Sequence, residues 1–123
     1  MENENEVEEV VEDPKISFDD FKKIEITIGE IKSVEKVENA DRLLKLEVNF
    51  GDHTRQIVSG IAEYYENMDD LIGRKCPFVT NLEPRTIKGV ESNGMIMAAG
   101  SKEAGFFSIL GVDGSVEPGT KVS

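Results

Sequence analysis

Lysine and arginine side chains recur through the middle of this sequence, and their types are suited to binding phosphate groups. A guanidinium or ammonium group pairs with a phosphate oxygen, while amide and hydroxyl side chains hydrogen-bond the sugar and phosphate oxygens between charges. Folded RNA is recognised mainly through its shape, its phosphates and its 2′-hydroxyls, so this mixture fits such a ligand. The candidate cations are Lys32, Lys36, Arg42, Lys45, Arg55, Arg85 and Lys88, and the candidate amides and hydroxyl are Asn81, Ser92 and Asn93.

The single cysteine and the single histidine exclude several other kinds of chemistry. Within one chain, Cys76 has no partner for a disulfide or a thiolate metal site. His53 stands beside Asp52 at the tip of an expected hairpin, where neighbouring side chains on a strand point apart. The sequence contains no phosphate-loop motif and no metal-ligand spacing. We therefore expect no enzyme activity, no metal site and no cofactor.

The net charge of −11 is concentrated at the N-terminus. Residues 1–20 hold nine acidic side chains against Lys15, whereas residues 21–123 hold 16 acidic and 13 basic side chains. Because a net-negative chain repels a polyanion at long range, binding to nucleic acid requires a local basic face. We expect residues 1–16 to form a flexible acidic tail, since so charged a segment buries too little apolar surface to become ordered.

Two alternatives concern this tail. Residues 4–12 could form a short amphipathic helix instead of a flexible segment. The tail could be a linker that adds solubility, or it could screen a basic face until RNA displaces it. No apolar run approaches the roughly 20 residues that span a bilayer, and the N-terminus lacks the pattern of a secretory signal. We expect a cytoplasmic protein that does not contact membranes.

Alternation of apolar and polar residues predicts the strands that must position the candidate side chains. A helical turn capped by Ser17 comes first, and a strand from Ile24 to Val37 follows, with a β-bulge at Gly29 where the apolar phase shifts by one residue. Further strands are expected at 44–50, 53–59, 76–80 and 94–99, with turns at 38–41 and 51–52 and a short helix or two helical turns at 61–72. Three strands, a helix and two strands are the order of the OB fold. The sequence thus predicts an all-β, five-stranded OB-fold barrel over residues 17–123, with a short helix between strands 3 and 4 and a C-terminal extension.

Three segments of the sequence resemble one known family. They are DFKKIEITIGEI at 20–31, ENADRL at 38–43 with QIVSGI at 56–61, and NLEPRTIKGVESNGMIMAA at 81–99. Together they resemble the tRNA-binding domain found at the C-terminus of many methionyl-tRNA synthetases, in free-standing homodimeric tRNA-binding proteins and in cytokine-like synthetase cofactors. The likeness covers about Ser17 to Val122. The chain departs from the family at Thr27, where the family usually has Arg, and at Val37-Glu38, where it often has His-Pro.

The resemblance implies a non-catalytic domain that binds the folded body of tRNA and helps a methionyl-tRNA synthetase to retain it. It also implies that the candidate cations and amides converge on one face of the barrel. Met1 and the lack of a catalytic domain favour a separate β-subunit, with an excised C-terminal domain of the synthetase as the other possibility. The resemblance further places a two-fold homodimer interface on the C-terminal extension and the Asn-Leu-x-Pro segment, through Leu82, Pro84, Phe106, Phe107, Ile109 and Leu110.

Two alternatives to this interpretation stay open. A homodimeric, peptide-binding, chaperone-like protein is possible because a related family shares the barrel. The C-terminal extension could also close its own barrel instead of forming a dimer. Single-stranded nucleic acid is the weaker target, because the chain lacks Trp and the relevant strands offer only Phe50 for base stacking.

Overall fold

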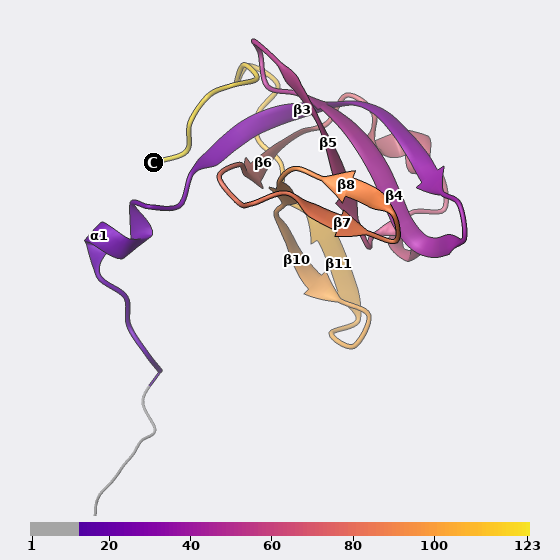
Figure 1. The fold of residues 1–123 in the computed structure, drawn as a ribbon, viewed down its shortest axis with the longest axis horizontal. Coiled ribbons are helices and arrows are strands. Elements are labelled where there is room, and N and C mark those ends of the chain that lie inside the picture. Colours follow the sequence, from indigo (N-terminus) through magenta and orange to yellow (C-terminus); the bar gives the residue numbers. More distant parts are fainter. Residues whose placement is uncertain (1–12) are drawn as a thin grey trace, which may run out of the picture.

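The computed structural model describes residues 13–123 (Figure 1). Most of the predicted acidic tail, including the alternative helix at 4–12, lies outside these residues, and residues 13–16 are exposed without helix or strand. The predicted cap at Ser17 is confirmed, because the Ser17 hydroxyl accepts a hydrogen bond from the Asp20 amide at 3.0 Å. Helix α1 (Phe18–Phe21) follows this cap.

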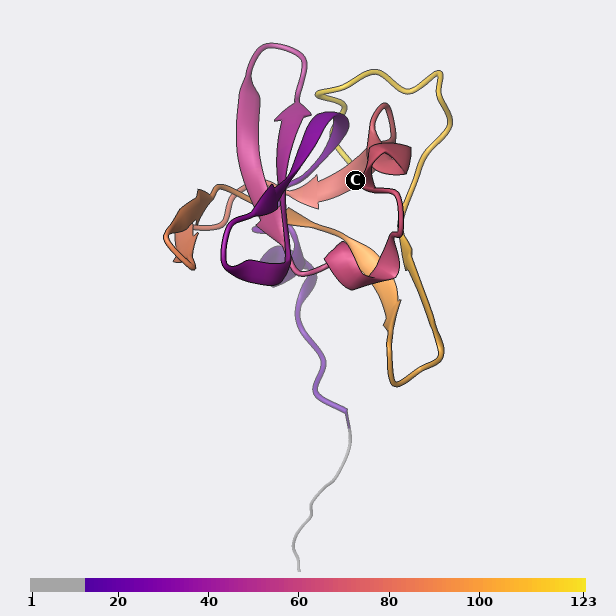
Figure 2. The ribbon, with the colours of Figure 1, turned by 90° about the vertical axis from the view of Figure 1, so that its right-hand side faces the viewer.

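Five strands form one curved antiparallel sheet, which confirms the predicted all-β architecture (Figures 1 and 2). Their order across the sheet is β5-β4-β3-β6-β9. The strands are β3 (Ile26–Val37), β4 (Ala40–Asn49), β5 (Thr54–Ser59), β6 (Lys75–Val79) and β9 (Met95–Ile96). Alternate residues of these strands point inward, and Leu46, Val48, Ile57 and Phe78 are fully buried in the common core.

The outer strands of the sheet come together, as an OB-fold barrel requires. The Asn93 amide donates to the Gln56 carbonyl at 2.9 Å, and the Val58 amide donates to the Ser92 hydroxyl at 2.9 Å. These hydrogen bonds join β5 to the segment that leads into β9. The barrel is therefore closed between β5 and β9 by one backbone hydrogen bond, from Asn93, and by one hydrogen bond to the Ser92 side chain.

The long first strand changes partners along its length. Its first part pairs with β6, and its second part pairs with β4 from Glu30 onward. The predicted bulge at Gly29 is misplaced, because the register of the β3–β4 ladder shifts between Ile31 and Ser33. Gly29 has another role: a Cβ atom there would lie 2.5 Å from the Val48 Cγ1 atom, so only glycine allows β4 to pack this closely.

Two short 3₁₀ helices occupy the predicted helical segment between β5 and β6. They are η1 (Ala62–Tyr64) and η2 (Met68–Leu71). Leu71 is fully buried, and Asn67 caps η2 by accepting a hydrogen bond from the Asp69 amide at 3.1 Å. The alternative of two helical turns is therefore the one that the structure adopts.

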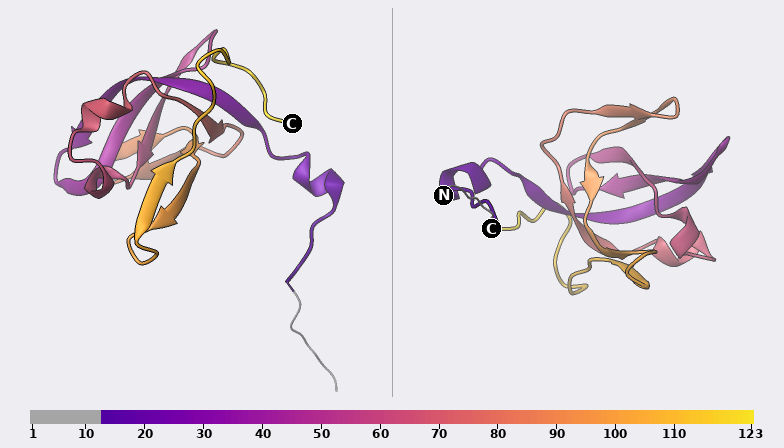
Figure 3. Two further views of the ribbon diagram at one scale, coloured as in Figure 1. Left: turned by 180° about the vertical axis from the view of Figure 1, so that it is seen from behind. Right: turned by 90° about the horizontal axis from the view of Figure 1, so that it is seen from below.

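Two hairpins extend from the barrel. The first is β7 (Arg85–Ile87) with β8 (Val90–Ser92), and the second is β10 (Ala98–Ser101) with β11 (Phe106–Ile109) (Figure 3). The predicted strand at 94–99 is thus divided between β9, in the barrel, and β10, in the second hairpin.

The end of the chain packs against its own barrel. The Gly119 amide donates to the Ile28 carbonyl at 2.7 Å, and the Ile28 amide donates to the Thr120 carbonyl at 2.8 Å. These bonds cover the edge of β3 that β4 leaves free. The last residues of the C-terminal extension therefore help to close their own barrel, and a role of the extension in dimerisation stays a prediction.

Candidate nucleic-acid interface

A groove of about 410 Å³ lies between two turns at one end of the barrel. One wall is the β3–β4 turn with the start of β4, and the other wall is the tip of the β7–β8 hairpin. The lining residues are Asn39, Ala40, Asp41, Arg42, Leu43, Ile87 and Lys88. In OB folds the loop between the first two strands and the loop between the last two flank the oligonucleotide-binding face, and these walls belong to the same two loops.

A small apolar cluster fixes the two walls beside each other. Val37, Ala40 and Val58 are buried on the outer side of the sheet, and Ile87 and Val90 of the hairpin pack against them. This cluster is separate from the barrel core. The hairpin is therefore held by packing and presents its tip next to the β3–β4 turn.

Arg42 and Lys88 place two cations at this groove. Both side chains are exposed, and neither forms an ion pair with another described residue. Lys88 (φ 51°) and Gly89 (φ 82°) form the two-residue turn that carries the lysine at the hairpin tip. The free cations, together with the open groove, are suited to phosphate groups.

Two further predicted cations lie on the strands that lead to the groove. Lys36 is exposed on β3 opposite Leu44 of β4, and Arg85 is exposed at the start of β7. Neither forms an ion pair within residues 13–123. The structure thus associates Lys36, Arg42, Arg85 and Lys88 with one end of the molecule, and we call these four residues the basic end.

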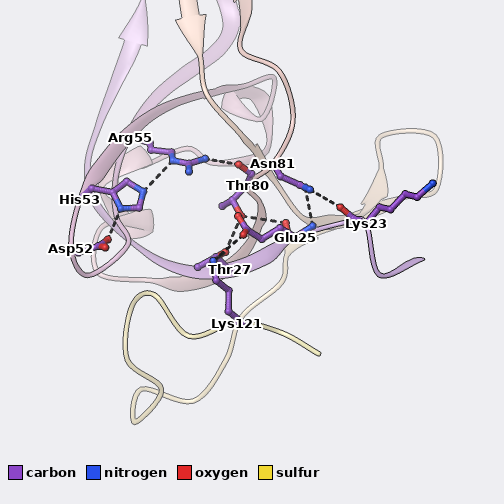
Figure 4. Close-up of polar contacts among 9 residues, drawn as sticks. All are labelled: Lys23, Glu25, Thr27, Asp52, His53, Arg55, Thr80, Asn81 and Lys121. Atoms are coloured by element: carbon purple, nitrogen blue, oxygen red, sulfur yellow. Dashed lines mark hydrogen bonds and ion pairs between the residues drawn. The ribbon is translucent and has the colours of Figure 1, made fainter. Parts of the chain in front are cut away.

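Arg55 lies elsewhere, at a second cleft of about 460 Å³ (Figure 4). It pairs across from Val48, about 20 Å along β4 from Arg42 at the usual rise of a strand. Its guanidinium donates to the Thr80 carbonyl at 2.7 Å and to the His53 Nε2 atom at 3.2 Å. Arg55 therefore lies apart from the groove, and its guanidinium is already bonded within the chain, although it shares a smaller cleft of about 290 Å³ with Lys45. That all the predicted cations act as one RNA-binding face stays a prediction.

The wall of this second cleft is a polar network that joins three segments of the chain (Figure 4). The Thr80 hydroxyl donates to the Glu25 carboxylate at 2.6 Å, and the Lys121 ammonium donates to the Thr27 hydroxyl at 3.2 Å. Lys121 also forms an ion pair with Glu25 at 3.2 Å. The hydrogen bonds from Thr80 and from Lys121 hold the pKa of the Glu25 carboxyl below its ordinary value. Sequence reasoning missed Lys121, because nothing local in the sequence indicates that the chain end returns to β3.

The remaining predicted contacts have structural partners. The Lys45 ammonium pairs with Glu35 at 3.2 Å, and the Lys32 ammonium is 4.0 Å from Glu30. Asn81 bridges to the start of β3, since its amide group accepts from the Glu25 amide and donates to the Lys23 carbonyl. These side chains are partly neutralised or occupied by contacts within the chain.

Ser92 and Asn93 also act within the fold. Ser92 is buried, with 4% of its surface exposed, and its hydroxyl bonds the Val58 amide. The prediction that Ser92 contacts RNA directly is therefore corrected to a positioning role behind the surface. Asn93 is half-buried, and its backbone amide is used in the link to β5.

The six residues predicted for a dimer interface do not form one exposed surface. Ile109 is buried in the barrel core, and the Phe107 ring stacks on Tyr64 with 4.0 Å between ring centroids. Ile109 is therefore corrected to intrachain packing, whereas Phe107 is only partly buried and its place in an interface stays a prediction. The exposed members are Leu82, Pro84, Phe106 and Leu110.

Two classes of feature are not found in the part of the chain that the structure describes. Within residues 13–123, no group of three or more His, Cys, Asp or Glu side chains is placed to hold a metal ion. No helix in the same range has the length and apolar character needed to cross a membrane.

Comparison with known proteins assigns the barrel to a family. The family model described as "Putative tRNA binding domain" matches residues 26–121, which include the groove, the basic end and all of the second cleft except Glu25. The chain belongs to this tRNA-binding domain family. The domain is a non-catalytic RNA-binding domain.

Members with similar sequences are much longer than this chain. The methionine–tRNA ligase of Deinococcus radiodurans is 48% identical over 110 residues, which are 89% of this chain and 16% of that protein. The methionine–tRNA ligase of Methanoregula boonei is 49% identical over 109 residues, again 89% of this chain and 16% of that protein. The chain thus spans about one-sixth of the length of these relatives, and within the tRNA-binding family it is related to their C-terminal domain.

Solved structures with the same fold are close to this chain in size. A MetRS-related protein from Pyrococcus horikoshii has 34% identity and a TM-score of 0.83, covering 89% of this chain and 99% of that one. The chaperone CsaA from Bacillus anthracis has 29% identity and a TM-score of 0.78, covering 89% of this chain and 100% of that one. The same fold therefore makes up nearly the whole of these two crystallised chains.

Proposed function

We propose that this domain binds the folded body of tRNA, with the groove at the basic end as its main contact. The observation that carries this proposal is the position of Arg42, at the start of β4, and Lys88, at the tip of the β7–β8 hairpin, in a tRNA-binding domain. Both cations are exposed and have no ion-pair partner among residues 13–123. Phosphate contacts of this kind fix position without reading sequence. Amino-acid identity is then decided by the catalytic partner.

The proposed partner is a methionyl-tRNA synthetase, to which the domain adds tRNA retention during aminoacylation. Support comes from the methionine–tRNA ligases that share 48% and 49% identity with this chain over most of its length. The domain would act either as the C-terminal part of such a ligase or in trans as an accessory β-subunit, in the cytoplasm. Either arrangement raises the local concentration of tRNA at the catalytic domain.

A local set of cations reconciles this function with a net charge of −11. Lys32 and Lys45 lie beside carboxylates, whereas the four cations of the basic end have no such partner among residues 13–123. Asp41 is the one acidic side chain in the groove lining, beside Arg42 and Lys88. At moderate salt, charges more than about 10 Å apart are largely screened, so these nearby charges dominate the field at the groove.

A second candidate function is the binding of extended peptides. It is favoured by the similarity to the chaperone CsaA and by the apolar Leu43 and Ile87 in the groove lining. A peptide would use this apolar floor, whereas RNA would use the cations at its rim. The two functions therefore predict different salt dependence.

The test is binding of the 123-residue chain to mixed folded tRNA across a salt series from about 50 mM to about 300 mM. We expect affinity to fall steeply with salt, with a log–log slope that corresponds to about three or more phosphates. The variant Arg42→Ala/Lys88→Ala should bind at least about tenfold more weakly and with a shallower slope, since each lost phosphate contact reduces the slope by about 0.9.

Lys102→Ala is the matched control, because Lys102 is an exposed cation on the β10–β11 hairpin, paired with Glu63. It should retain the affinity and slope of the unmodified chain. An equal loss of tRNA affinity in the control and in the double variant would mean that binding depends on the overall charge of the chain. That result would contradict the proposal that the groove is the main contact. Binding of an apolar peptide that is insensitive to salt, with no binding of tRNA, would favour the chaperone-like function.

A further inference from the structure

The groove at the basic end has two features that phosphate groups do not use. Its lining includes the apolar side chains of Leu43 and Ile87 and the carboxylate of Asp41. A phosphate is a hydrated anion, so it gains nothing from an apolar floor and is repelled by a nearby carboxylate. The groove therefore contains more than the contacts that hold an RNA backbone.

Leu43 and Ile87 form the apolar floor of the groove. Leu43 lies on β4 and Ile87 on the β7–β8 hairpin, so each wall contributes one side chain (Figure 1). Both residues are half-buried and pack on the outer apolar cluster of Val37, Ala40 and Val58. Protein pockets hold unstacked nucleobases against apolar side chains of this kind. The groove volume of about 410 Å³ also lies in the range of about 300–1,000 Å³ that is usual for small-ligand pockets.

Asp41 provides a hydrogen-bond acceptor beside this floor. It directly precedes Arg42 at the start of β4, its side chain is exposed, and it forms no ion pair with another residue of the range 13–123. An ionised carboxylate only accepts hydrogen bonds. Among cations that hold phosphates, it weakens binding unless the ligand presents N–H groups to it. The ligand expected at Asp41 is therefore a hydrogen-bond donor.

The four RNA bases differ in the N–H groups on their Watson–Crick edges. Guanine presents two neighbouring donors, N1–H and the N2 amino group, which match the two oxygens of one carboxylate. Adenine and cytosine present one amino donor next to a ring-nitrogen acceptor, and uracil presents one donor between two carbonyl acceptors. Guanine is therefore the base that satisfies both oxygens of Asp41 without placing an acceptor against them. The Asn39 amide, which also lines the groove, offers a donor for the guanine O6 atom.

We propose that this groove takes an unpaired guanine from a loop or bulge of folded RNA. The base lies on Leu43 and Ile87, and its Watson–Crick edge meets Asp41. The phosphates on either side of this nucleotide meet Arg42 and Lys88. The inference rests on the proposed function, because it concerns the same groove, and it adds a base that the domain reads. Unpaired nucleotides are the usual target of sequence-dependent RNA recognition, since a base must leave its stack before side chains can reach its edge.

Both walls of the groove are already ordered without a ligand. Val37 pairs with Ala40 across the β3–β4 turn, and Ile87 pairs with Val90 across the hairpin turn. Each wall is thus closed by a turn of two residues. Because such short turns have little freedom to lose, a base can enter at a low cost in loop entropy.

The experiment measures binding of the 123-residue chain to stem-loop RNAs that share one stem and one loop without guanine. Four of them carry a single bulged nucleotide, which is G, A, C or U, and the fifth has a fully paired stem. The bulged-G RNA should bind at least about tenfold more tightly than the bulged-U and the fully paired RNAs, as expected for one bidentate contact to a base edge. Mixed folded tRNA is titrated in parallel, with the unmodified chain and with Arg42→Ala/Lys88→Ala.

Asp41→Asn replaces the carboxylate by an amide of the same shape, with one acceptor and one donor group. This variant should lose the preference for guanine and bind bulged A or C at least as tightly as bulged G, because an amide matches their donor–acceptor edges. Asp113→Asn is the matched control, since it removes the same charge from an exposed aspartate that does not line the groove. It should keep the guanine preference. Both variants lose one negative charge, so the ratio of affinities between RNAs is what is compared.

Equal affinities of the unmodified chain for the four bulged RNAs would overturn this inference. A guanine preference that survives Asp41→Asn, or that is lost in Asp113→Asn, would overturn it too. If tRNA binding still depends on Arg42 and Lys88 in those cases, the proposed function stands while this inference fails. If neither tRNA nor any stem-loop RNA binds, both fail.

Discussion

The Lys121 ammonium lies 3.2 Å from the Thr27 hydroxyl and so ties the end of the chain to its first strand. Thr27 is buried, with 4% of its surface exposed, and its hydroxyl also bonds that of Thr80 at 2.8 Å. Thr27 stands where the family that this sequence resembles usually has Arg. In this chain the Lys121 cation reaches the cleft beside Thr27 from the C-terminal segment. The C-terminal extension therefore both closes the barrel and contributes Lys121 to the wall of this cleft.

Thr80→Val should raise the pKa of the Glu25 carboxyl toward its ordinary value of 4.5, because the Thr80 hydroxyl provides the largest of the contributions that lower it. Since the folded state lowers this pKa, the charged carboxylate stabilises the fold above the unfolded pKa, and the contribution is lost as pH falls through the folded pKa. The variant should lose part of this acid sensitivity. Carboxyl chemical shifts followed by NMR from about pH 7 to about pH 2, a range that includes ordinary Glu pKa values, measure the change. An unchanged Glu25 titration would show that the Lys121 contacts alone set the pKa.

Gly29→Ala should destabilise the barrel by about 1–3 kcal/mol, the usual cost of an added methyl group in a packed core. The new Cβ atom would lie 2.5 Å from Val48 Cγ1 and 2.7 Å from Phe50 Cε1, and all three residues are buried. Gly60→Ala is the control, because the nearest side-chain atom there is 3.9 Å away. Urea unfolding midpoints measure both variants. Equal midpoints for the two would mean that β3 and β4 can move apart at no cost.

The sequence predicted the fold well because its signals there are local. Strand alternation and the Ser17 cap are properties of neighbouring residues, and both are confirmed. The groups at the candidate site were harder to place. The sequence offers Arg42 and Arg55 as equivalent candidate cations. In the structure the Arg55 guanidinium donates to the Thr80 carbonyl, whereas Arg42 is exposed and has no ion-pair partner among residues 13–123. That difference depends on where β6 and the C-terminal segment lie in space, which no short stretch of sequence encodes.

Ser92→Ala should lower the free energy of unfolding by about 1–3 kcal/mol, the cost of leaving a buried donor without its partner. The partner is the Val58 amide, which donates to the Ser92 hydroxyl at 2.9 Å where β5 approaches the chain before β9. The salt slope of tRNA binding should stay the same, because a buried hydroxyl meets no phosphate. Denaturant unfolding and the tRNA salt series measure the two effects separately. A shallower slope at unchanged stability would restore Ser92 as a direct contact.

Deleting residues 1–14 should tighten tRNA binding several-fold at low salt if these residues screen the basic end. They contain seven acidic side chains and no lysine or arginine, so their removal changes the formal net charge from −11 to −4 and weakens the long-range repulsion of a polyanion. The gain should disappear at about 300 mM salt, where the screening length is well below 10 Å. A chain with the same fourteen residues in scrambled order keeps the charge and should bind like the unmodified one. Unchanged affinity of the deletion across the whole salt series would leave the segment as a linker or a solubility tail.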